Sequence, residues 1–152
     1  MITLVGKALA KDGLVFYCYK NTKCIGCKYY RVCMSNIADG RKYRILKVMD
    51  HSLPCKLHEE GEANVVEIEE TDYDVLIPTK HAVLDATIVY DPRLCKFYKC
   101  PNRMHCFADG LVPGDKCKVI ELDEEYDTTC LNKERLAKVK LKRITKENED
   151  EE

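Results

Sequence analysis

The run MITLVGKALAKDGLVFY (1–17) is matched later in the chain by DVLIPTKHAVLDATIVY (74–90). When the sequence is shifted by 73 positions, Tyr17 falls on Tyr90 and apolar residues fall on apolar residues. Self-similarity at a fixed period is typical of a structural unit that occurs more than once. We therefore expect a chain that contains two copies of one unit.

The two predicted copies account for nearly all of the 152 residues. The order of features in residues 1–73 recurs in residues 74–146 with only small insertions, and the acidic end, residues 147–152, is predicted to be a disordered tail. Each copy is small for an independent hydrophobic core. We expect the two homologous units to pack as one pseudo-twofold barrel or as paired sheets.

Both units have the pattern of β-strands. The stretches VVEIEE (65–70) and KVKLK (138–142) alternate apolar and charged residues, which is typical of a strand with one buried face. The solvent face is acidic in the first stretch and basic in the second. The full set of predicted strands is 2–10, 14–19, 41–48, 65–70, 75–78, 82–90, 116–122 and 135–144, with short helical turns at 27–35 and 102–107, so the predicted fold is mainly β with cysteine-bearing loops.

Ten cysteines are the outlier of the composition, whereas the net charge of −1 predicts no particular partner. No secretory signal is visible, and no apolar run approaches the length of about 20 residues that a membrane span needs. In a cytoplasmic protein, clustered cysteines indicate bound metal more often than disulfides. We therefore expect a cytoplasmic metal-binding protein that does not contact a membrane.

Eight of the cysteines form two equivalent sets. Each set has three cysteines within one short stretch, CIGCKYYRVC (24–33) or CKFYKCPNRMHC (95–106), and a fourth further along the chain. Four thiolates suffice for a zinc ion or for an iron–sulfur cluster. The candidate metal ligands are Cys24, Cys27, Cys33 and Cys55 in the first unit and Cys95, Cys100, Cys106 and Cys130 in the second.

The two remaining cysteines break the repeat. At the same alignment, Cys18 lies opposite Asp91, and Cys117 lies opposite Tyr43. A free cysteine without a metal-binding partner behaves as a small apolar residue. We therefore predict that Cys18 and Cys117 are buried core residues and not ligands.

The spacing of the ligands favours iron–sulfur clusters over zinc. Structural zinc sites with four thiolates favour two short C-x2-C hairpins, and neither unit supplies a second one. Two [4Fe–4S] clusters would serve electron transfer or redox sensing, together with a redox partner protein. If both sites hold zinc instead, the chain is a zinc-stabilised binding module for RNA, a ribonucleoprotein or a protein complex.

Basic and aromatic residues alternate within the first cysteine stretch. Lys28, Tyr29, Tyr30 and Arg31 are a candidate nucleic-acid contact, because RNA-binding surfaces combine stacking rings with cations. The alternative is an ordinary solvated face. No nucleophile–base pair and no phosphate-binding glycine loop is visible, so the sequence predicts no catalytic residue and at most a redox accessory protein.

Several motifs together resemble one family of archaeal proteins. They are the opening MITLVGKALAKDGLVFY, the C-x2-C-x5-C stretch followed by GRKYRILKV, and then ATIVY, CPNRMHC and PGDKCKVIEL. The chain resembles the uncharacterised family UPF0179 along nearly its whole length, the acidic tail excepted. The resemblance implies an archaeal protein whose two cysteine clusters are suggested to be iron–sulfur redox centres, and it implies no substrate or partner.

Overall fold

The computed structural model describes residues 1–92 and 95–146, so the predicted disordered tail at 147–152 lies outside the described residues. The chain divides into two compact units, Met1–Thr71 and a second that starts at Asp72. This division falls two residues before the boundary that the repeat predicts. Among the described residues, no helix has both the length and the apolar character needed to cross a membrane.

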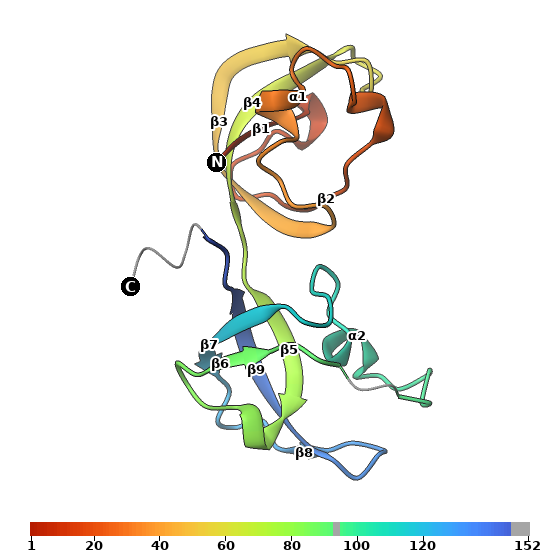
Figure 1. Cartoon of the computed structure of the whole chain (residues 1–152), viewed down its shortest axis with the longest axis vertical. Coiled ribbons are helices and arrows are strands. Elements are labelled where there is room, and N and C mark those ends of the chain that lie inside the picture. Colours follow the sequence, from red (N-terminus) through yellow and green to blue (C-terminus); the bar gives the residue numbers. More distant parts are fainter. Residues whose placement is uncertain (93–94, 147–152) are drawn as a thin grey trace. The chain divides into compact units, whose positions relative to one another are not determined.

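The first unit is one antiparallel sheet with the strand order β1-β4-β3-β2 (Figure 1). The long strand β3 bends, and its pairing with β4 shifts between Ile45 and Lys47 and again between Val48 and Ser52. Such irregularities increase the local twist, so the sheet curls. The elements are β1 (Ile2–Gly6), the 3-10 helix η1 (Lys7–Leu9), β2 (Val15–Cys18), η2 (Thr22–Cys24), α1 (Tyr30–Cys33), β3 (Arg41–Pro54) and β4 (Glu62–Glu70).

The second unit is also one antiparallel sheet, with the order β5-β9-β7-β6 and the short β8 paired to β9. The pairing of β7 with β9 shifts between Val119 and Glu121. The elements are β5 (Tyr73–Pro78), η3 (Thr79–His81), β6 (Thr87–Val89), α2 (Arg103–Cys106), β7 (Lys116–Leu122), β8 (Thr128–Thr129) and β9 (Arg135–Arg143). The prediction of a mainly β protein is therefore confirmed, and α1 and α2 lie within the predicted helical turns. The predicted strands 2–10 and 82–90 are wrong in part, because η1 occupies Lys7–Leu9 and β6 covers only Thr87–Val89.

The backbone hydrogen bonds set a different register from the one that identical residues predict. Gly13 N–H donates to the Ile45 carbonyl at 2.8 Å, and in the second unit Asp85 N–H donates to the Val119 carbonyl at 2.8 Å. Both donors have a positive φ, 81° for Gly13 and 64° for Asp85. In these bonds Gly13 takes the place of Asp85, an offset of 72, whereas residue identity matches Tyr17 with Tyr90 at an offset of 73.

When the two units are compared by these hydrogen bonds, the two extra cysteines have other counterparts than residue identity gives them. Gly40 N–H donates to the carbonyl of Cys18 at 2.6 Å, and Gly114 N–H donates to that of Tyr90 at 2.8 Å. Cys18 thus corresponds to Tyr90 and not to Asp91. Since Phe16 pairs with Tyr43 and Ile88 pairs with Cys117, Tyr43 and Cys117 also correspond.

Each unit has its own hydrophobic core. Along β7, and along β9 from Lys138 to Lys142, buried residues alternate with more exposed ones, as the period-two pattern predicts, whereas β1 and β5 bury several consecutive residues. In both cores, a buried cysteine and a buried tyrosine lie together among aliphatic side chains. The first core contains Val5, Cys18, Ile37, Tyr43, Ile45, Val66 and Ile68, and the second contains Tyr73, Val75, Ile77, Tyr90, Leu111, Cys117, Val119, Val139 and Leu141.

Candidate metal centres in the cysteine-bearing loops

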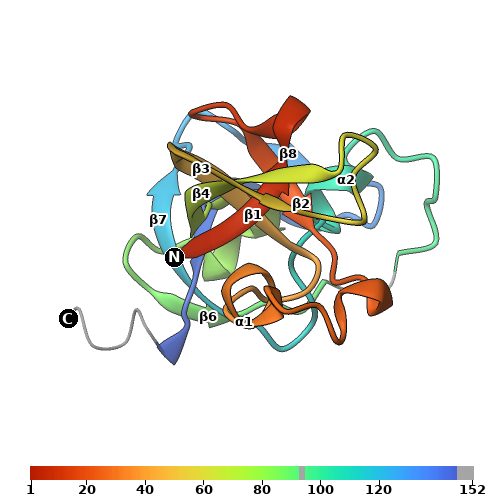
Figure 2. The same cartoon turned by 90° about the horizontal axis from the view of Figure 1, so that it is seen from above.

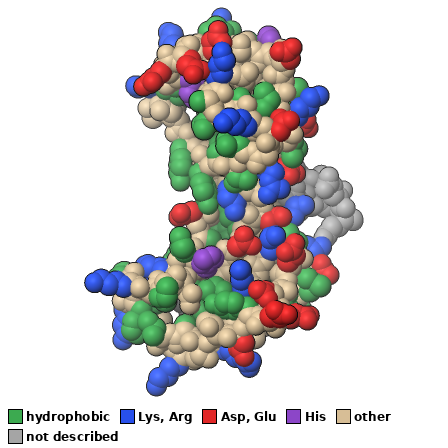
Figure 3. Space-filling view, turned by 180° about the vertical axis from the view of Figure 1, so that it is seen from behind, with side chains coloured by type: hydrophobic (Ala, Val, Ile, Leu, Met, Phe, Trp, Pro, Cys, Tyr) green, Lys and Arg blue, Asp and Glu red, His purple; other side chains and the backbone are tan. Residues whose placement is uncertain are grey.

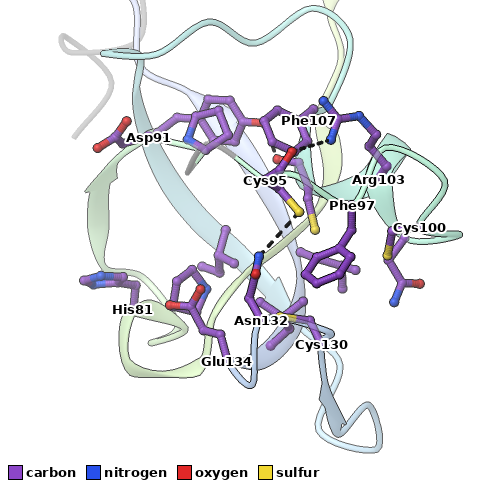
Figure 4. Close-up of a pocket in the computed structure, with 18 of the residues that line it drawn as sticks. His81, Asp91, Cys95, Phe97, Cys100, Arg103, Phe107, Cys130, Asn132 and Glu134 are labelled. Atoms are coloured by element: carbon purple, nitrogen blue, oxygen red, sulfur yellow. Dashed lines mark hydrogen bonds between the residues drawn. The ribbon is translucent and has the colours of Figure 1, made fainter.

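A cavity of about 560 Å³ lies in the second unit (Figure 4). It is enclosed by β5, β6, α2 and the turn that leads into β9, and its lining is mixed, with apolar side chains and a few polar ones. All four predicted ligands of the second set line it: Cys95, Cys100, Cys106 and Cys130. The structure therefore brings these four residues to one cavity, although Cys130 is distant in sequence from the other three.

Tight turns present the first three of these cysteines. Cys100 N–H donates to the Phe97 carbonyl at 3.1 Å, and Arg103 N–H donates to the Cys100 carbonyl at 3.1 Å. These bonds form successive turns that lead into α2, which ends at Cys106. The end of α2 is held by Tyr90, whose hydroxyl donates to the Cys106 carbonyl at 3.0 Å.

The fourth cysteine is held by a separate turn. Cys130 N–H donates to the Glu134 carbonyl at 2.9 Å, and Lys133 N–H donates back to the Cys130 carbonyl at 2.8 Å. Lys133 has a φ of 60°, a left-handed conformation that is uncommon for a residue with a side chain. This turn connects β8 to β9, so the sheet itself carries Cys130 to the cavity.

Two side chains fix the position of Cys95. The Asn132 amide donates to Cys95 Sγ at 3.4 Å, and the Arg103 guanidinium donates to the Cys95 carbonyl at 3.3 Å (Figure 4). The same guanidinium lies 4.4 Å from the ring centroid of Phe107, within the range of a cation–π contact. A cation and an amide donor therefore lie beside the second set of sulfurs.

The electrostatics of the second set join its members. Burial raises the pKa of the Cys106 thiol, and negative charge on Cys100, Cys130 and Cys95 adds to the rise. Each of the other three thiols thus lies within electrostatic reach of Cys106. Four thiolates gathered in this way repel one another, and a bound cation would relieve that repulsion.

The first set is assembled by the corresponding elements of the first unit. Cys24 ends η2, Cys33 ends α1, and Cys55 follows β3 directly. Figure 2 shows α1 beside β1, where Thr3 Oγ1 donates to the Cys33 carbonyl and the Cys33 thiol lies 3.9 Å from the Leu4 carbonyl. The end of α1 is thereby anchored to the edge strand β1.

Turns again position the remaining ligands of this set. Cys27 N–H donates to the Cys24 carbonyl at 3.0 Å, and Gly26 between them has a φ of 87°, which glycine adopts without strain. Cys55 N–H donates to the Gly61 carbonyl at 2.9 Å. This bond closes the loop after Cys55 as the bond from Cys130 to Glu134 does in the second unit.

The thiols of the first set also influence one another. Burial raises the pKa of Cys24, and negative charge on Cys55 and Cys27 adds to the rise. Burial likewise raises the pKa of Cys33, which is affected further by Cys24 and Cys55.

Within residues 1–92 and 95–146, however, no three His, Cys, Asp or Glu side chains are close enough to share one metal ion.

The surroundings of Cys18 were predicted only in part from the sequence. Burial raises its pKa to about 11, and negative charge on Cys33 adds to the rise. The thiol is buried, as predicted, but it also lies within electrostatic reach of the first set. Cys117 is fully buried, with its Sγ 3.9 Å from the Asp115 carbonyl.

The candidate nucleic-acid residues lie between two predicted ligands. Lys28 and Arg31 are exposed, whereas Tyr29 and Tyr30 are half-buried. Lys28 Nζ lies 4.9 Å above the Tyr29 ring, so this cation contacts its own neighbour. The four residues thus belong to the loop that carries Cys27 and Cys33.

Sequence reasoning missed several residues of the cavity. His81, Asp91, Asn132 and Glu134 line it together with the four cysteines (Figure 4). The one signal for Asn132 and Glu134 is their position within four residues of Cys130. His81 and Asp91 reach the cavity from η3 and from the end of β6, a proximity that tertiary structure alone creates.

These observations define the class: a mainly β, cysteine-rich protein with two antiparallel sheets and one group of four cysteines in the loops of each. Residues 1–141 match the uncharacterised protein family UPF0179. The chain belongs to this family. The family resemblance predicted from the sequence motifs is therefore confirmed.

Curated relatives cover nearly the full length of the chain. A UPF0179 protein of Methanosphaera stadtmanae is 37% identical over 142 residues, which are 93% of this chain and 99% of the relative. A UPF0179 protein of Pyrococcus furiosus is 36% identical over 152 residues, 97% of each chain. A third, from Methanocaldococcus jannaschii, is 34% identical over 125 residues, 82% of each chain. No solved structure matches the chain.

Proposed function

We propose that the chain is a cytoplasmic redox protein that holds two [4Fe–4S] clusters, one in each unit. Such a cluster supplies reversible one-electron transfer when it is bound. The chain would pass electrons to a partner protein or sense the redox state of the cell. The first cluster would be held by Cys24, Cys27, Cys33 and Cys55, and the second by Cys95, Cys100, Cys106 and Cys130.

One observation carries this proposal: four cysteines from three separate segments line a single cavity of about 560 Å³. Soft thiolate donors suit iron–sulfur clusters and zinc. The cavity is far larger than one ion, and the ligands approach it from a loop, a helix end and a turn between strands. This spread favours a cluster with several metal atoms over a single zinc ion.

The neighbouring side chains suit an anionic centre. A cluster ligated by four thiolates carries negative charge, and hydrogen bonds to its sulfurs help to set its reduction potential. Asn132 donates such a bond to Cys95, and the Arg103 cation lies next to the same residue. In the proposed role, these two side chains stabilise the ligand sulfur and orient its loop.

We also infer that the two units are copies of one ancestral unit, which extends the argument to the first set. Support comes from their identical strand order and from helices α1 and α2, which end at corresponding cysteines. The N–H groups of Cys55 and Cys130 each close the loop that follows, by donating to the carbonyls of Gly61 and Glu134. A site in the second unit therefore predicts a second site of the same kind in the first.

Metal analysis of protein purified without oxygen tests this function. We expect about eight iron and eight sulfide per chain, from two clusters of four iron atoms each. The protein should be brown, and its broad visible absorbance should bleach on reduction with dithionite. A matched Cys117→Ser variant should retain the same iron content, because Cys117 is a core residue that lies outside both sets.

The opposite result would identify the alternative function. Colourless protein with about two zinc ions per chain would refute the redox role and leave a zinc-stabilised binding module. Binding of RNA by such a module would then be examined at Lys28, Tyr29, Tyr30 and Arg31. Absence of both metals from oxygen-free material would reject both functions.

A further inference from the structure

The loop after the fourth cysteine of each set contains a side chain that can donate a hydrogen bond. In the second unit it is Asn132, whose amide donates to Cys95 Sγ at 3.4 Å. In the first unit the position two residues after Cys55 is Leu57, and the next residue is His58, which is half-buried. A neutral imidazole has one N–H that donates, so His58 can supply what Leu57 lacks.

The imidazole of His58 packs against the end of β1. A Cβ added at Gly6 would lie 2.7 Å from His58 Nδ1 and 2.9 Å from His58 Cε1, so the ring occupies the space that any larger residue would need. Gly6 has a φ of −56°, which every residue adopts, so its backbone does not require glycine. The ring has its Nδ1 side against the strand, and Nε2 is the nitrogen left to face other groups.

Two connections place His58 near the ligands of the first set. Cys55 N–H donates to the Gly61 carbonyl at 2.9 Å and Gly61 N–H donates to the His58 carbonyl at 2.9 Å, so one closed loop holds Cys55 and His58. On the other side, Leu4 lies two residues before Gly6, about 7 Å along β1. The Cys33 thiol lies 3.9 Å from the Leu4 carbonyl.

The second unit shows what the corresponding place contains there. Pro78 is the counterpart of Gly6, because each residue ends the first strand of its unit and directly precedes a 3-10 helix. Their backbones also agree, with φ −56° and ψ 145° at Gly6 and φ −54° and ψ 133° at Pro78. Pro78 lines the same cavity as Cys95, Cys100, Cys106 and Cys130. By this correspondence, His58 covers a residue that stands in the place of a wall of the cysteine site.

The charged surface does not favour one unit over the other. The whole chain carries 25 basic and 26 acidic residues, and Figure 3 shows cations and carboxylates interspersed on the face that it presents. Salt screens exposed charges beyond about 10 Å at 0.1 M ionic strength. Single donors beside the sulfurs therefore have the greater influence on the potential of each centre.

We propose that His58 donates its imidazole N–H to a sulfur of the metal centre that the first set holds, as Asn132 donates to Cys95 in the second. This role rests on the proposed function, because it requires a cluster at the first set. A donor to such a sulfur stabilises the more negative, reduced form and raises the reduction potential. His58 is a positioning residue and not a ligand, since the four cysteines already complete the set.

His58→Leu tests this role, because it removes the donor and keeps an apolar side chain over Gly6. In a redox titration of cluster-loaded protein followed by electron paramagnetic resonance, the equilibrium constant for reduction of one centre should fall about tenfold, which is 59 mV for one electron. The other centre should not change. Iron should stay at about eight atoms per chain. His58→Gln, which restores an N–H donor, should recover most of the loss.

Two further variants show where the donor acts. Asn132→Leu is the matched control in the second unit, and it should lower the potential of the centre that His58→Leu leaves unchanged. Gly6→Ala places a methyl group where the His58 ring lies and displaces the ring, although the imidazole is still present. It should therefore lower the potential of the same centre as His58→Leu.

Four results would overturn the role of His58 and leave the redox function standing. They are unchanged potentials in His58→Leu at full iron content, an equal fall in His58→Gln, a shift of one and the same centre by His58→Leu and Asn132→Leu, and loss of half of the iron from His58→Leu. The last would identify His58 as a ligand. Wild-type protein without iron would instead refute the redox function, and the role of His58 with it.

Discussion

In the first unit, Cys18 ends β2 and Tyr43 lies on β3, whereas in the second unit Tyr90 follows β6 and Cys117 lies on β7. The two units therefore fill two corresponding core positions with the same pair of residue types in exchanged order. Each tyrosine hydroxyl accepts a hydrogen bond from an alanine in its own unit. Ala38 N–H donates to the Tyr43 hydroxyl at 2.8 Å, and Ala108 N–H donates to that of Tyr90 at 3.0 Å.

The exchange separates the cysteines that belong to the core from those that belong to the candidate sites. A tyrosine replaces Cys18 in the second unit, and another replaces Cys117 in the first. Among the loop cysteines, Cys27 takes the place of Cys100 and Cys33 that of Cys106. Cys24 takes the place of Phe97, because Cys27 N–H donates to the Cys24 carbonyl as Cys100 N–H donates to that of Phe97. The comparison therefore favours Cys18 and Cys117 as core residues, even though Cys18 lies within electrostatic reach of the first set.

The largest effect that can sharpen this comparison is loss of metal. Cys55→Ser and Cys130→Ser should each lose about half of the bound metal, because each removes one of four thiolate ligands from one site. Total metal per chain, measured on oxygen-free protein, checks the expectation. The two variants should behave alike, since each cysteine is the one ligand of its set that comes from outside the short cysteine stretch.

Cys18→Ser is the control for this experiment. It keeps the size of the side chain, removes the thiol and should leave the metal content unchanged. A loss as large as that of Cys55→Ser would show that Cys18 is a ligand, and the correspondence between the two sets would then break.

A smaller effect concerns the exchanged tyrosines. Tyr43→Phe and Tyr90→Phe each remove the hydroxyl that accepts an alanine N–H, so each should lower the free energy of unfolding by about 1–2 kcal/mol. Amide hydrogen exchange locates the change. Ala38 should lose protection in Tyr43→Phe, and Ala108 should lose it in Tyr90→Phe, without a change in the other unit.

The reverse pattern, or equal deprotection of both alanines, would contradict the view that each tyrosine serves its own unit. Loss of protection in one unit alone, with the other substitution silent, would show that the exchanged positions are not equivalent.

The smallest effect concerns charged residues that lie directly opposite each other on the paired strands β3 and β4. Glu69→Lys places a lysine opposite Arg44 and should lower the free energy of unfolding by a few tenths to about 1 kcal/mol, because like charges at directly opposite positions of paired strands destabilise a sheet. Urea denaturation measures the change. Glu59→Lys, an exposed substitution in the loop after Cys55, is the matched control. If it lowers the free energy of unfolding equally, the pair of Arg44 and Glu69 makes no specific contribution to stability.

The strands were predictable from the sequence because their buried faces repeat with a period of two. β4 and β9 follow from VVEIEE and KVKLK, where the alternation is clear. The full length of β3 could not be predicted, because its second half is exposed and its pairing with β4 shifts twice. Exposed, irregular strands lack the apolar alternation on which such predictions depend.

The register between the units was not predictable from residue identity. Identical pairs such as Lys7 and Lys80 favour an offset of 73, while backbone hydrogen bonds at Gly13 and Asp85 require 72. What is preserved is the left-handed conformation, which glycine adopts freely and aspartate tolerates. Backbone geometry, and not side-chain identity, sets the alignment there.

The candidate site, too, could be predicted only in part from the sequence. Cysteine spacing predicted the two sets of four residues, and the structure gathers the second set around one cavity. The non-cysteine lining could not be predicted, because His81 and Asp91 reach it through the pairing of strands that are distant in sequence. Arg103 was hidden among many charged residues, and its role depends on the rings of Tyr98 and Phe107 beside it.

The hydrogen bond from the Asn132 side-chain amide to Cys95 Sγ has no counterpart at the equivalent place in the first unit. Asn132 follows Cys130 by two residues, whereas the residue two positions after Cys55 is Leu57, which has no side-chain donor. A donor to a ligand sulfur withdraws electron density from the metal and makes its reduction easier. In the proposed redox protein, this hydrogen bond would make a centre in the second unit easier to reduce than it would be without Asn132.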